Sequence, residues 1–162
     1  MRVGRAGAVV RIGVISDTHG LLRPEAVRAL RGVDLIVHAG DVGSPDVLEG
    51  LRVISRVAAV RGNNDRGAWA RALDDAVTIR AGGARIHVLH DVTELALDPV
   101  EAGIAVVIAG HSHQPAVATR DGVLFLNPGS AGPRRFSLPT TVARLTVRDG
   151  RARARIVPLA IA

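Results

Sequence analysis

Two histidines two residues apart, His111 and His113, follow an apolar run in the segment VVIAGHSHQP at residues 106–115. Neutral imidazole nitrogens are common metal ligands, so such a pair at the end of a buried strand can form part of a metal site. The same pair could also lie in a solvated loop. The residues that follow the other apolar runs of the chain decide between these two interpretations.

Four other apolar runs also end in side chains that can bind a metal. These are Asp17 and His19 after RIGVIS, Asp41 at the end of DLIVHAGD, Asn63 after VAAVRG, and His90 at the end of ARIHVLH. Each short motif arises often by chance and has an ordinary structural explanation, such as a turn or a strand end. Ligands in an open α/β sheet bind outside the carboxyl ends of the strands, so five such ends are expected to meet at one edge.

The set contains two carboxylates, one amide oxygen and four imidazoles. This mixture suits manganese, iron, cobalt, nickel or zinc better than calcium, which prefers an all-oxygen site. Seven side chains exceed the needs of one tetrahedral ion, but they fit two ions that share a carboxylate. The sequence therefore predicts a binuclear metal centre that holds divalent ions of this borderline class.

Composition excludes several other kinds of chemistry. The chain has no cysteine and no lysine, which removes thiolate nucleophiles, cysteine-bound zinc, Schiff bases and a P-loop lysine. Its net charge of +6 comes from arginine and could attract nucleic acid or an anionic substrate. Aromatic residues make up 2% of the chain, too few for a module that stacks on single-stranded bases, so a nucleic-acid partner is not favoured.

The order of elements predicts a mixed α/β domain. Strands are expected at residues 11–16, 34–40, 57–62, 84–90 and 104–110, and helices are expected to start at Pro24 and at Ser44 with Pro45. Asp-Gly pairs at 121–122 and 149–150 predict two β-hairpins in the last third.

Length and hydropathy predict one domain over residues 1–162, with residues 1–10 as an irregular leader. No apolar run is long enough for a membrane helix, and the leader lacks the apolar core of a signal peptide. We therefore expect a cytoplasmic protein with no membrane partner. The sequence leaves the oligomeric state open.

The ordered motifs Asp-x-His, Gly-Asp, Gly-Asn, His and Gly-His-x-His, followed by Asn-Pro-Gly-Ser, resemble the calcineurin-like metallophosphoesterase superfamily. The short length resembles its YfcE-type bacterial and archaeal phosphodiesterases, and the likeness covers residues 11 to 157. The resemblance implies a β-sandwich of mixed sheets flanked by α-helices. It also implies hydrolysis of a small phosphate ester, preferably a diester, by a metal-bridging water or hydroxide.

When the family's metal ligands are matched to this sequence motif by motif, the resemblance implies two ion sites that share Asp41. Asp41, Asn63 and His111 are also expected to be the catalytic residues. The first ion would be held by Asp17, His19 and His113, and the second by Asn63, His90 and His111. Manganese is the expected metal, with nickel, iron, cobalt or zinc as alternatives.

Two positions depart from the family pattern. Larger relatives have a histidine where this chain has Asn64, and an asparagine cannot act as a general acid at neutral pH. YfcE-type members commonly lack this histidine too. Asp91 stands where related chains often have glycine; it could orient an imidazole or, as we slightly favour, face solvent. Arg61 and Asn64 are the candidate substrate contacts.

Other charged residues attract weaker hypotheses. Arg134 and Arg135 could reach a substrate phosphate, and His38 is expected to pack or to support a ligand. The arginines of the last strand, at 151, 153 and 155, could form an anionic docking stripe or a solvated face. Two rival functions remain: a scaffold protein, as in the retromer subunit of this fold, or a nuclease, which would need a basic groove leading to the site.

Overall fold

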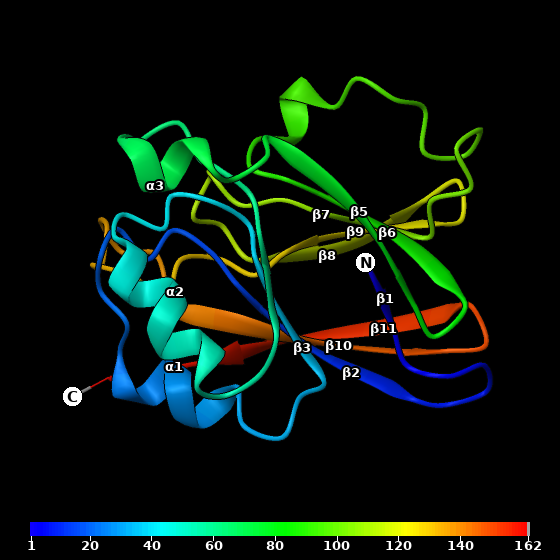
Figure 1. Cartoon of the computed structure of the whole chain (residues 1–162), viewed down its shortest axis with the longest axis horizontal. Coiled ribbons are helices and arrows are strands. Elements are labelled where there is room, and N and C mark those ends of the chain that lie inside the picture. The colour runs from blue at the N-terminus through cyan, green and yellow to red at the C-terminus, as the bar shows by residue number, and fades with distance from the viewer. Residues whose placement is uncertain (162) are drawn as a thin grey trace.

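Two mixed β-sheets pack face to face in the computed structural model, which describes residues 1–161 (Figure 1). The first sheet has the strand order β1-β5-β6-β7-β9-β8 and the second has the order β11-β10-β2-β3-β4. The strands of the first sheet are β1 (Arg2–Val3), β5 (Ala76–Ala81), β6 (Ala84–Leu89), β7 (Val106–Ile108), β8 (Ala116–Arg120) and β9 (Val123–Asn127). Those of the second are β2 (Val10–Ile15), β3 (Leu35–His38), β4 (Val57–Ala59), β10 (Thr141–Arg148) and β11 (Arg151–Pro158).

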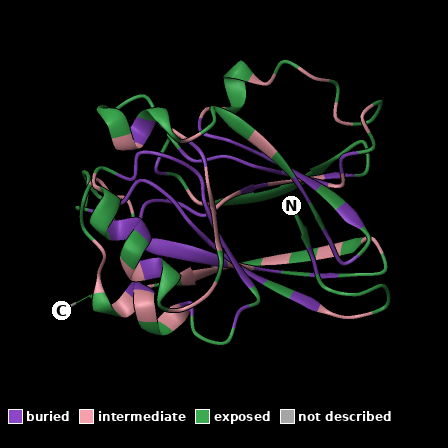
Figure 2. Ribbon diagram, in the orientation of Figure 1, coloured by how far each residue is buried: buried purple, intermediate pink, exposed green. Residues whose placement is uncertain are grey.

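The core lies between the two sheets. Alternating side chains of β2, β3 and β10, among them Ile12, Leu35 and Leu145, meet those of β5, β6 and β7, among them Ile86 and Ile108. These five side chains are fully buried. The buried residues line the inside of the sandwich, and the outer surfaces of many strands are exposed (Figure 2). The β-sandwich of mixed sheets that the resemblance implied is confirmed.

Helices cover part of the outer face of the second sheet. Helix α1 (Pro24–Ala29) begins at the predicted proline, and α2 (Pro45–Arg52) begins after Ser44, whose Oγ accepts a hydrogen bond from the backbone of Asp46 at 3.2 Å. Their apolar sides pack on Ile36 and Val142. A short helix α3 (Ala68–Arg71) and a 3₁₀ turn η1 (Val92–Glu94) lie in the loops near the carboxyl ends of β4 and β6. No helix in the described chain is long and apolar enough to cross a membrane.

Two sets of parallel strands direct the loops toward one end of the sandwich. Strands β2, β3 and β4 are parallel in the second sheet, and β6, β7 and β9 are parallel in the first. The five predicted strands all form, and they are divided between the two sheets. The loops after these strands still meet, because the two parallel sets pack face to face with their carboxyl ends at the same end.

Both Asp-Gly hairpins form as predicted. Strand β8 pairs with β9 across residues 121–122, and β10 pairs with β11 across residues 149–150. Both residues of each turn have positive φ, from 50° to 77°, which is the requirement of a type I′ turn. The antiparallel character of the last third was therefore readable from the sequence.

The expected irregular leader contains one short strand, while residues 4–9 form neither helix nor strand. Arg2 and Val3 form β1, which pairs in parallel with β5, and the side chain of Val3 is buried in the core. Strand β5 itself was not predicted, although AVTIRA alternates and is followed by a Gly-Gly turn. The burial of Val3 against this unpredicted strand explains why the first residues are ordered.

Gly13 and Leu30 provide a test of how α1 packs on the second sheet. A Cβ at Gly13 would lie 2.5 Å from Cδ2 of the fully buried Leu30. We predict that Gly13→Ala lowers the free energy of unfolding by about 1–3 kcal/mol through overpacking, and Leu30→Ala by about 2–5 kcal/mol through a cavity. The double variant should lose less than the sum, as measured by chemical denaturation. Strictly additive losses would show that the two residues do not share this space.

Candidate metal centre

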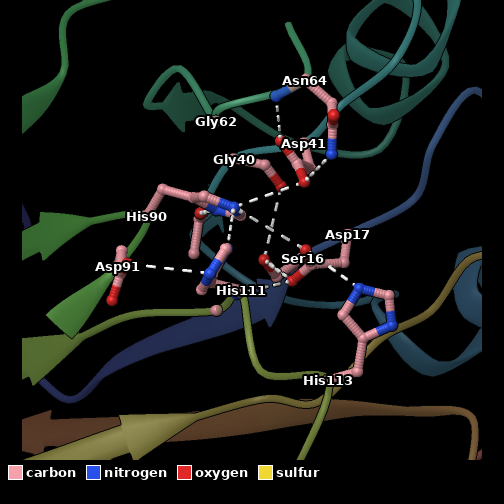
Figure 3. A network of polar contacts seen from close by, with 12 residues as sticks. Ser16, Asp17, Gly40, Asp41, Gly62, Asn64, His90, Asp91, His111 and His113 are labelled. Carbon is pink, nitrogen blue, oxygen red and sulfur yellow. Dashed lines mark hydrogen bonds and ion pairs between the residues drawn. The ribbon is translucent and has the colours of Figure 1, made fainter. Parts of the chain in front are cut away.

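Six of the seven predicted ligands come close together at the end of the sandwich where the parallel strands finish. Asp17 and His19 follow β2, Asp41 follows β3, His90 follows β6, and His111 and His113 follow β7. Figure 3 shows the two carboxylates at the centre, with His90, His111 and His113 around them. Asn63, the seventh, lies after β4 and is exposed.

The carboxylate of Asp17 is fully buried and only half satisfied by hydrogen bonds. Its Oδ2 accepts hydrogen bonds from Ser16 Oγ at 2.6 Å and from the backbone N–H of His111 at 3.0 Å. Its Oδ1 accepts none from the described chain. Oδ1 instead faces imidazole Nε2 atoms at 3.3 Å for His113 and 3.9 Å for both His19 and His90.

Asp41 is held by Asn64 and His90. The backbone N–H and the side-chain Nδ2 of Asn64 each donate to this carboxylate at 2.9 Å, and His90 Nε2 lies 3.4 Å from Oδ2. Burial raises the pKa of Asp41, but the hydrogen bonds from His90 and Asn64 outweigh it and hold this pKa well below its usual value. Asp41 is therefore a carboxylate anion over the whole physiological range.

His90 is oriented by the main chain. Its Nδ1 lies 2.7 Å from the carbonyl oxygen of Ala39 and donates a hydrogen bond to it, because a carbonyl can only accept. Nε2 is thereby directed at the two carboxylates. Burial lowers the pKa of His90, but Asp41 and Asp17 raise it to a net value of about 8. The carboxylates therefore favour a positive charge at this position, whether a proton or a metal ion.

The remaining imidazoles approach one another. His19 and His113 have their Nε2 atoms 3.4 Å apart, and His111 Nδ1 lies 3.3 Å from His90 Nε2. Burial is the main cause that lowers the pKa of His113, and the positive charge of Arg135 adds to it. Arg134 and Arg135 themselves are exposed, in the loop between β9 and β10.

Asp91 contacts His111, contrary to the slight preference for a solvent-facing carboxylate. Its Oδ1 accepts hydrogen bonds from the backbone and hydroxyl of Thr93 at 3.0 and 2.8 Å. Its Oδ2 lies 3.6 Å from Nε2 of His111, and 23% of the Asp91 side chain is exposed. The arrangement places a carboxylate behind an imidazole, which orients the ring.

Asn63 and Arg61 line a cavity of about 460 Å³ beside His90 and His111. Arg61 Nε and Nη2 both donate to Oδ1 of Asp75, at 3.0 and 2.6 Å. The guanidinium is therefore fixed at the wall of the cavity. Asn64, the other candidate substrate contact, donates to Asp41 from its backbone N–H and from its side-chain Nδ2, so its visible role is to position that carboxylate.

Five predicted ligands have left-handed backbone conformations. The φ angles of Asp17, His19, Asp41, His111 and His113 lie between 47° and 68°. Residues other than glycine rarely adopt this region, which costs roughly 1 kcal/mol or more each. Strain of this kind gathers at functional sites, where the rest of the fold imposes it.

Close packing around the carboxylates also constrains the loops. A Cβ at Gly110 would collide with Ser16 Oγ and would lie 2.6 Å from Asp17 Oδ2. Only glycine lets the loop after β7 approach Asp17 and bring His111 N–H into hydrogen-bond range. Gly110, the residue before the histidine pair, is therefore needed for the geometry of the site.

Sequence reasoning missed Asp65, the last residue of GNND. Its carboxylate accepts hydrogen bonds from three backbone N–H groups: Gly62 at 2.9 Å, Gly43 at 2.9 Å and Val42 at 3.2 Å. These bonds join the loop after β4 to the loop that carries Asp41. The signal was an aspartate three residues after a glycine, which is too common a pattern to stand out.

His38 supports the loops, as expected. Its Nδ1 accepts a hydrogen bond from the N–H of Gly40 at 3.1 Å, so its Nε2 carries the proton that it donates to Thr18 Oγ1 at 2.9 Å. Thr18 Oγ1 in turn donates to the carbonyl of Val42 at 2.8 Å. Burial is the main cause that lowers the pKa of His38 to about 3, so it stays neutral.

The donors suit divalent metal ions. Two groups have ligand atoms within 4.8 Å of one another, namely Asp17 with His19 and His113, and Asp17 with Asp41 and His90. The buried Asp17 Oδ1, which faces three imidazoles and receives no hydrogen bond from the described chain, is a natural ligand atom. The mixture of carboxylate and imidazole fits the borderline metals predicted from the sequence.

Comparison with known proteins agrees with this chemistry. The calcineurin-like phosphoesterase superfamily domain model matches residues 10–150. A probable metallophosphoesterase of Methanothermobacter thermautotrophicus is 38% identical over 142 residues, which are 81% of this chain and 83% of the relative. A phosphodiesterase of Methanocaldococcus jannaschii is 27% identical over 81% of this chain and 90% of its own length.

A solved structure with the same fold is Vps29 of Chaetomium thermophilum. It superposes with a TM-score of 0.74 at 19% identity, over 93% of this chain and 97% of its own. At this identity the likeness concerns the fold alone.

We predict that Asp65→Ala destabilises the protein by about 2–4 kcal/mol, because three backbone N–H groups in closely packed loops lose their acceptor. Chemical denaturation would measure the loss. Asp74→Ala, which removes an exposed carboxylate a few residues away, should cost less than about 0.5 kcal/mol. Equal effects of the two substitutions would refute the role assigned to Asp65.

His38 should make stability depend on pH. Its pKa is about 3 in the folded protein and about 6.5 when unfolded, so its contribution is complete above pH 6.5 and is lost as the pH falls toward 3. The expected slope approaches 1.4 kcal/mol per pH unit. Unfolding free energies of the wild type and His38→Asn should converge between pH 6.5 and 4; parallel curves would contradict the prediction.

Proposed function

Because the chain belongs to the calcineurin-like phosphoesterase superfamily, we propose that it is a phosphodiesterase that uses two divalent metal ions. The observation that carries the proposal is the buried Asp17 carboxylate, whose Oδ1 faces three imidazole nitrogens within 3.9 Å. A carboxylate in this position is best compensated by metal ions. The family supplies the reaction class, and this donor set supports it.

The proposed ligands divide into two sets with Asp41 in common. Asp17, His19 and His113 hold one ion; Asn63, His90 and His111 hold the other. Manganese is the first choice, and nickel, iron, cobalt or zinc are compatible with these donors. Bound ions would polarise the phosphoryl group as Lewis acids and lower the pKa of water so that it can attack phosphorus.

The protein's own residues fix the geometry of this reaction. The carbonyl of Ala39 orients His90, Asn64 orients Asp41, and Asp91 orients His111. These contacts hold the ligand atoms before substrate arrives, which lowers the cost of reorganisation during catalysis. Asn64 cannot protonate a leaving group, so esters with good leaving groups, such as aryl diesters, are the preferred substrates.

The cavity beside Asn63, His90 and His111 supports a small substrate. Its volume is about 460 Å³, and its lining includes the carboxylates of Asp75, Asp91 and Glu94. Arg61 pairs with Asp75 in this wall, but the carboxylates of Asp91 and Glu94 leave the wall acidic overall, which disfavours long polyanions. The cavity therefore favours a small diester over a nucleic acid as substrate.

The rival function is a scaffold protein, suggested by the fold shared with Vps29. All seven ligand positions in this chain carry side chains that can bind metal; five of them form two close groups, and His111 lies beside His90. A protein that acts only through its outer surface has no use for such a strained and polar arrangement at the end of the sandwich. A metal-dependent activity test separates the two.

The central test uses protein stripped of metal with a chelator and then supplied with single ions. We expect hydrolysis of a bis-aryl phosphodiester to return with Mn²⁺, and to exceed hydrolysis of the aryl monoester. Isothermal titration should show about two Mn²⁺ ions bound per chain. Absence of turnover with every metal, in protein that still binds the ions, would favour the scaffold.

We predict that Asp41→Asn and His113→Ala each lower kcat by at least 10³-fold in protein that remains folded, because each removes a ligand at the reacting centre. His87→Ala is the matched control. His87 pairs with Thr78 on the outer face of the first sheet, 2.9 Å from its hydroxyl, and its replacement should leave kcat within a factor of two. Full turnover by both ligand variants would disprove the assignment.

A further inference from the structure

A group of arginines covers the part of the second sheet that the helices leave open. We call it the arginine face; it comprises outward-facing residues of β2, β10 and β11, namely Arg11, Arg144, Arg148, Arg151, Arg153 and Arg155. The inward-facing neighbours on β10 and β2, such as Leu145 and Ile12, are buried in the core. Figure 2 shows β11 alternating between exposed and half-buried residues.

The register brings like charges together on this face. Arg144 lies directly opposite Arg155, and Arg148 lies opposite Arg151. Arg153 is opposite Thr146, which is in turn opposite Arg11 on β2. Like charges directly across a sheet are destabilising, so this arrangement costs folding energy that a bound anion would recover.

Little negative charge compensates these arginines. In the described chain the face has one ion pair, a 3.7 Å contact between Arg148 and the exposed Asp149. Arg144 donates to the backbone carbonyls of Ala29 and Arg31 at the end of α1. The guanidinium groups of Arg151, Arg153 and Arg155 make no hydrogen bond or ion pair to the described residues. They are therefore available to a ligand.

The face is concave as well as basic. One hollow of about 340 Å³ is lined by Arg11, Arg144, Arg153 and Arg155, and another of about 480 Å³ by Arg148, Arg151 and Arg153. The two share Arg153, so they are adjacent. A ridge of negative charge can enter such hollows, whereas a flat lipid surface cannot.

We propose that the arginine face binds the phosphate backbone of double-stranded nucleic acid. Alternate residues of a strand are about 6.6–6.8 Å apart, so β11 presents a regular row of guanidinium groups to a regular row of phosphates. Guanidinium groups bind phosphate oxygens in bidentate fashion. The scarcity of aromatic residues fits contacts to the backbone, which need no stacking and carry no sequence preference.

This binding is separate from the proposed hydrolysis. Strand β2 runs from Val10, opposite Val147, to Ile15, two residues before Asp17. Arg148 and Arg151 therefore lie at the end of the sheet remote from the metal centre, and the face looks outward, not into the cavity beside His90. The acidic wall of that cavity also separates the two functions. The arginine face would bind the enzyme to nucleic acid without bringing the nucleic acid into the metal centre.

The test measures binding of a labelled 20-base-pair DNA and of the matching RNA duplex, across a range of salt concentrations. The wild type should bind both at 50 mM salt, with log K falling steeply against log salt. The triple variant Arg151→Gln/Arg153→Gln/Arg155→Gln should bind at least tenfold more weakly, and its salt slope should be smaller by about 3. Its turnover of the aryl diester should equal that of the wild type.

The matched control is Arg56→Gln/Arg66→Gln/Arg71→Gln, which removes the same charge from exposed positions elsewhere on the molecule. It should retain most of the affinity and the salt slope. An equal loss in both triple variants would overturn the proposal, because binding would then follow net charge alone. Lack of duplex binding by the wild type at 50 mM salt would overturn it too, as would loss of binding to phosphatidylserine vesicles but not to duplexes in the first triple variant.

Discussion

The structure depends on one electrostatic constraint: two buried carboxylates, those of Asp17 and Asp41, must face the same small volume. A buried carboxylate is costly unless it is paired or hydrogen-bonded. Oδ2 of Asp17 accepts two hydrogen bonds, and Asp41 accepts one each from the backbone N–H and the side-chain Nδ2 of Asn64. Oδ1 of Asp17, in contrast, faces only imidazoles. Four histidines from three loops gather around this centre of negative charge. The arrangement suits the proposed metal ions, and loops from both sheets position it.

The sandwich resolves this constraint by joining loops from two sheets. Parallel strands in each sheet end at the same edge, and the candidate ligands follow within a few residues of the strand ends, which brings them together. Five of these residues have left-handed backbone angles. The side chains of Asp65 and His38 hold these loops in place through hydrogen bonds to backbone N–H groups. The candidate ligands are therefore positioned by their loops as well as by their side-chain contacts.

Much of this was predictable from the sequence, for identifiable reasons. Apolar runs that end in metal-binding residues mark strand ends, and the hairpins follow from Asp-Gly pairs. The division of the strands between two sheets was not predictable from those runs, since a buried strand looks the same in either sheet. The role of Asp65 and the contact from Asp91 to His111 were not predicted either, because both depend on loop conformation. The burial of Val3 depends on β5, a strand that the patterning had left out.

The same sheet register separates the two charged regions of the molecule. The carboxyl end of β2 leads into the acidic, imidazole-rich centre, and its amino end lies beside the arginine pairs of β10 and β11. Metal ligands must converge, so they occupy loops at the end of the sandwich. The arginines occupy the open face of the second sheet, where alternate residues point to solvent and where the register sets several of them directly opposite one another. The candidate metal ligands and the arginines can stay apart because β2 and its partner β10 cross the core between them.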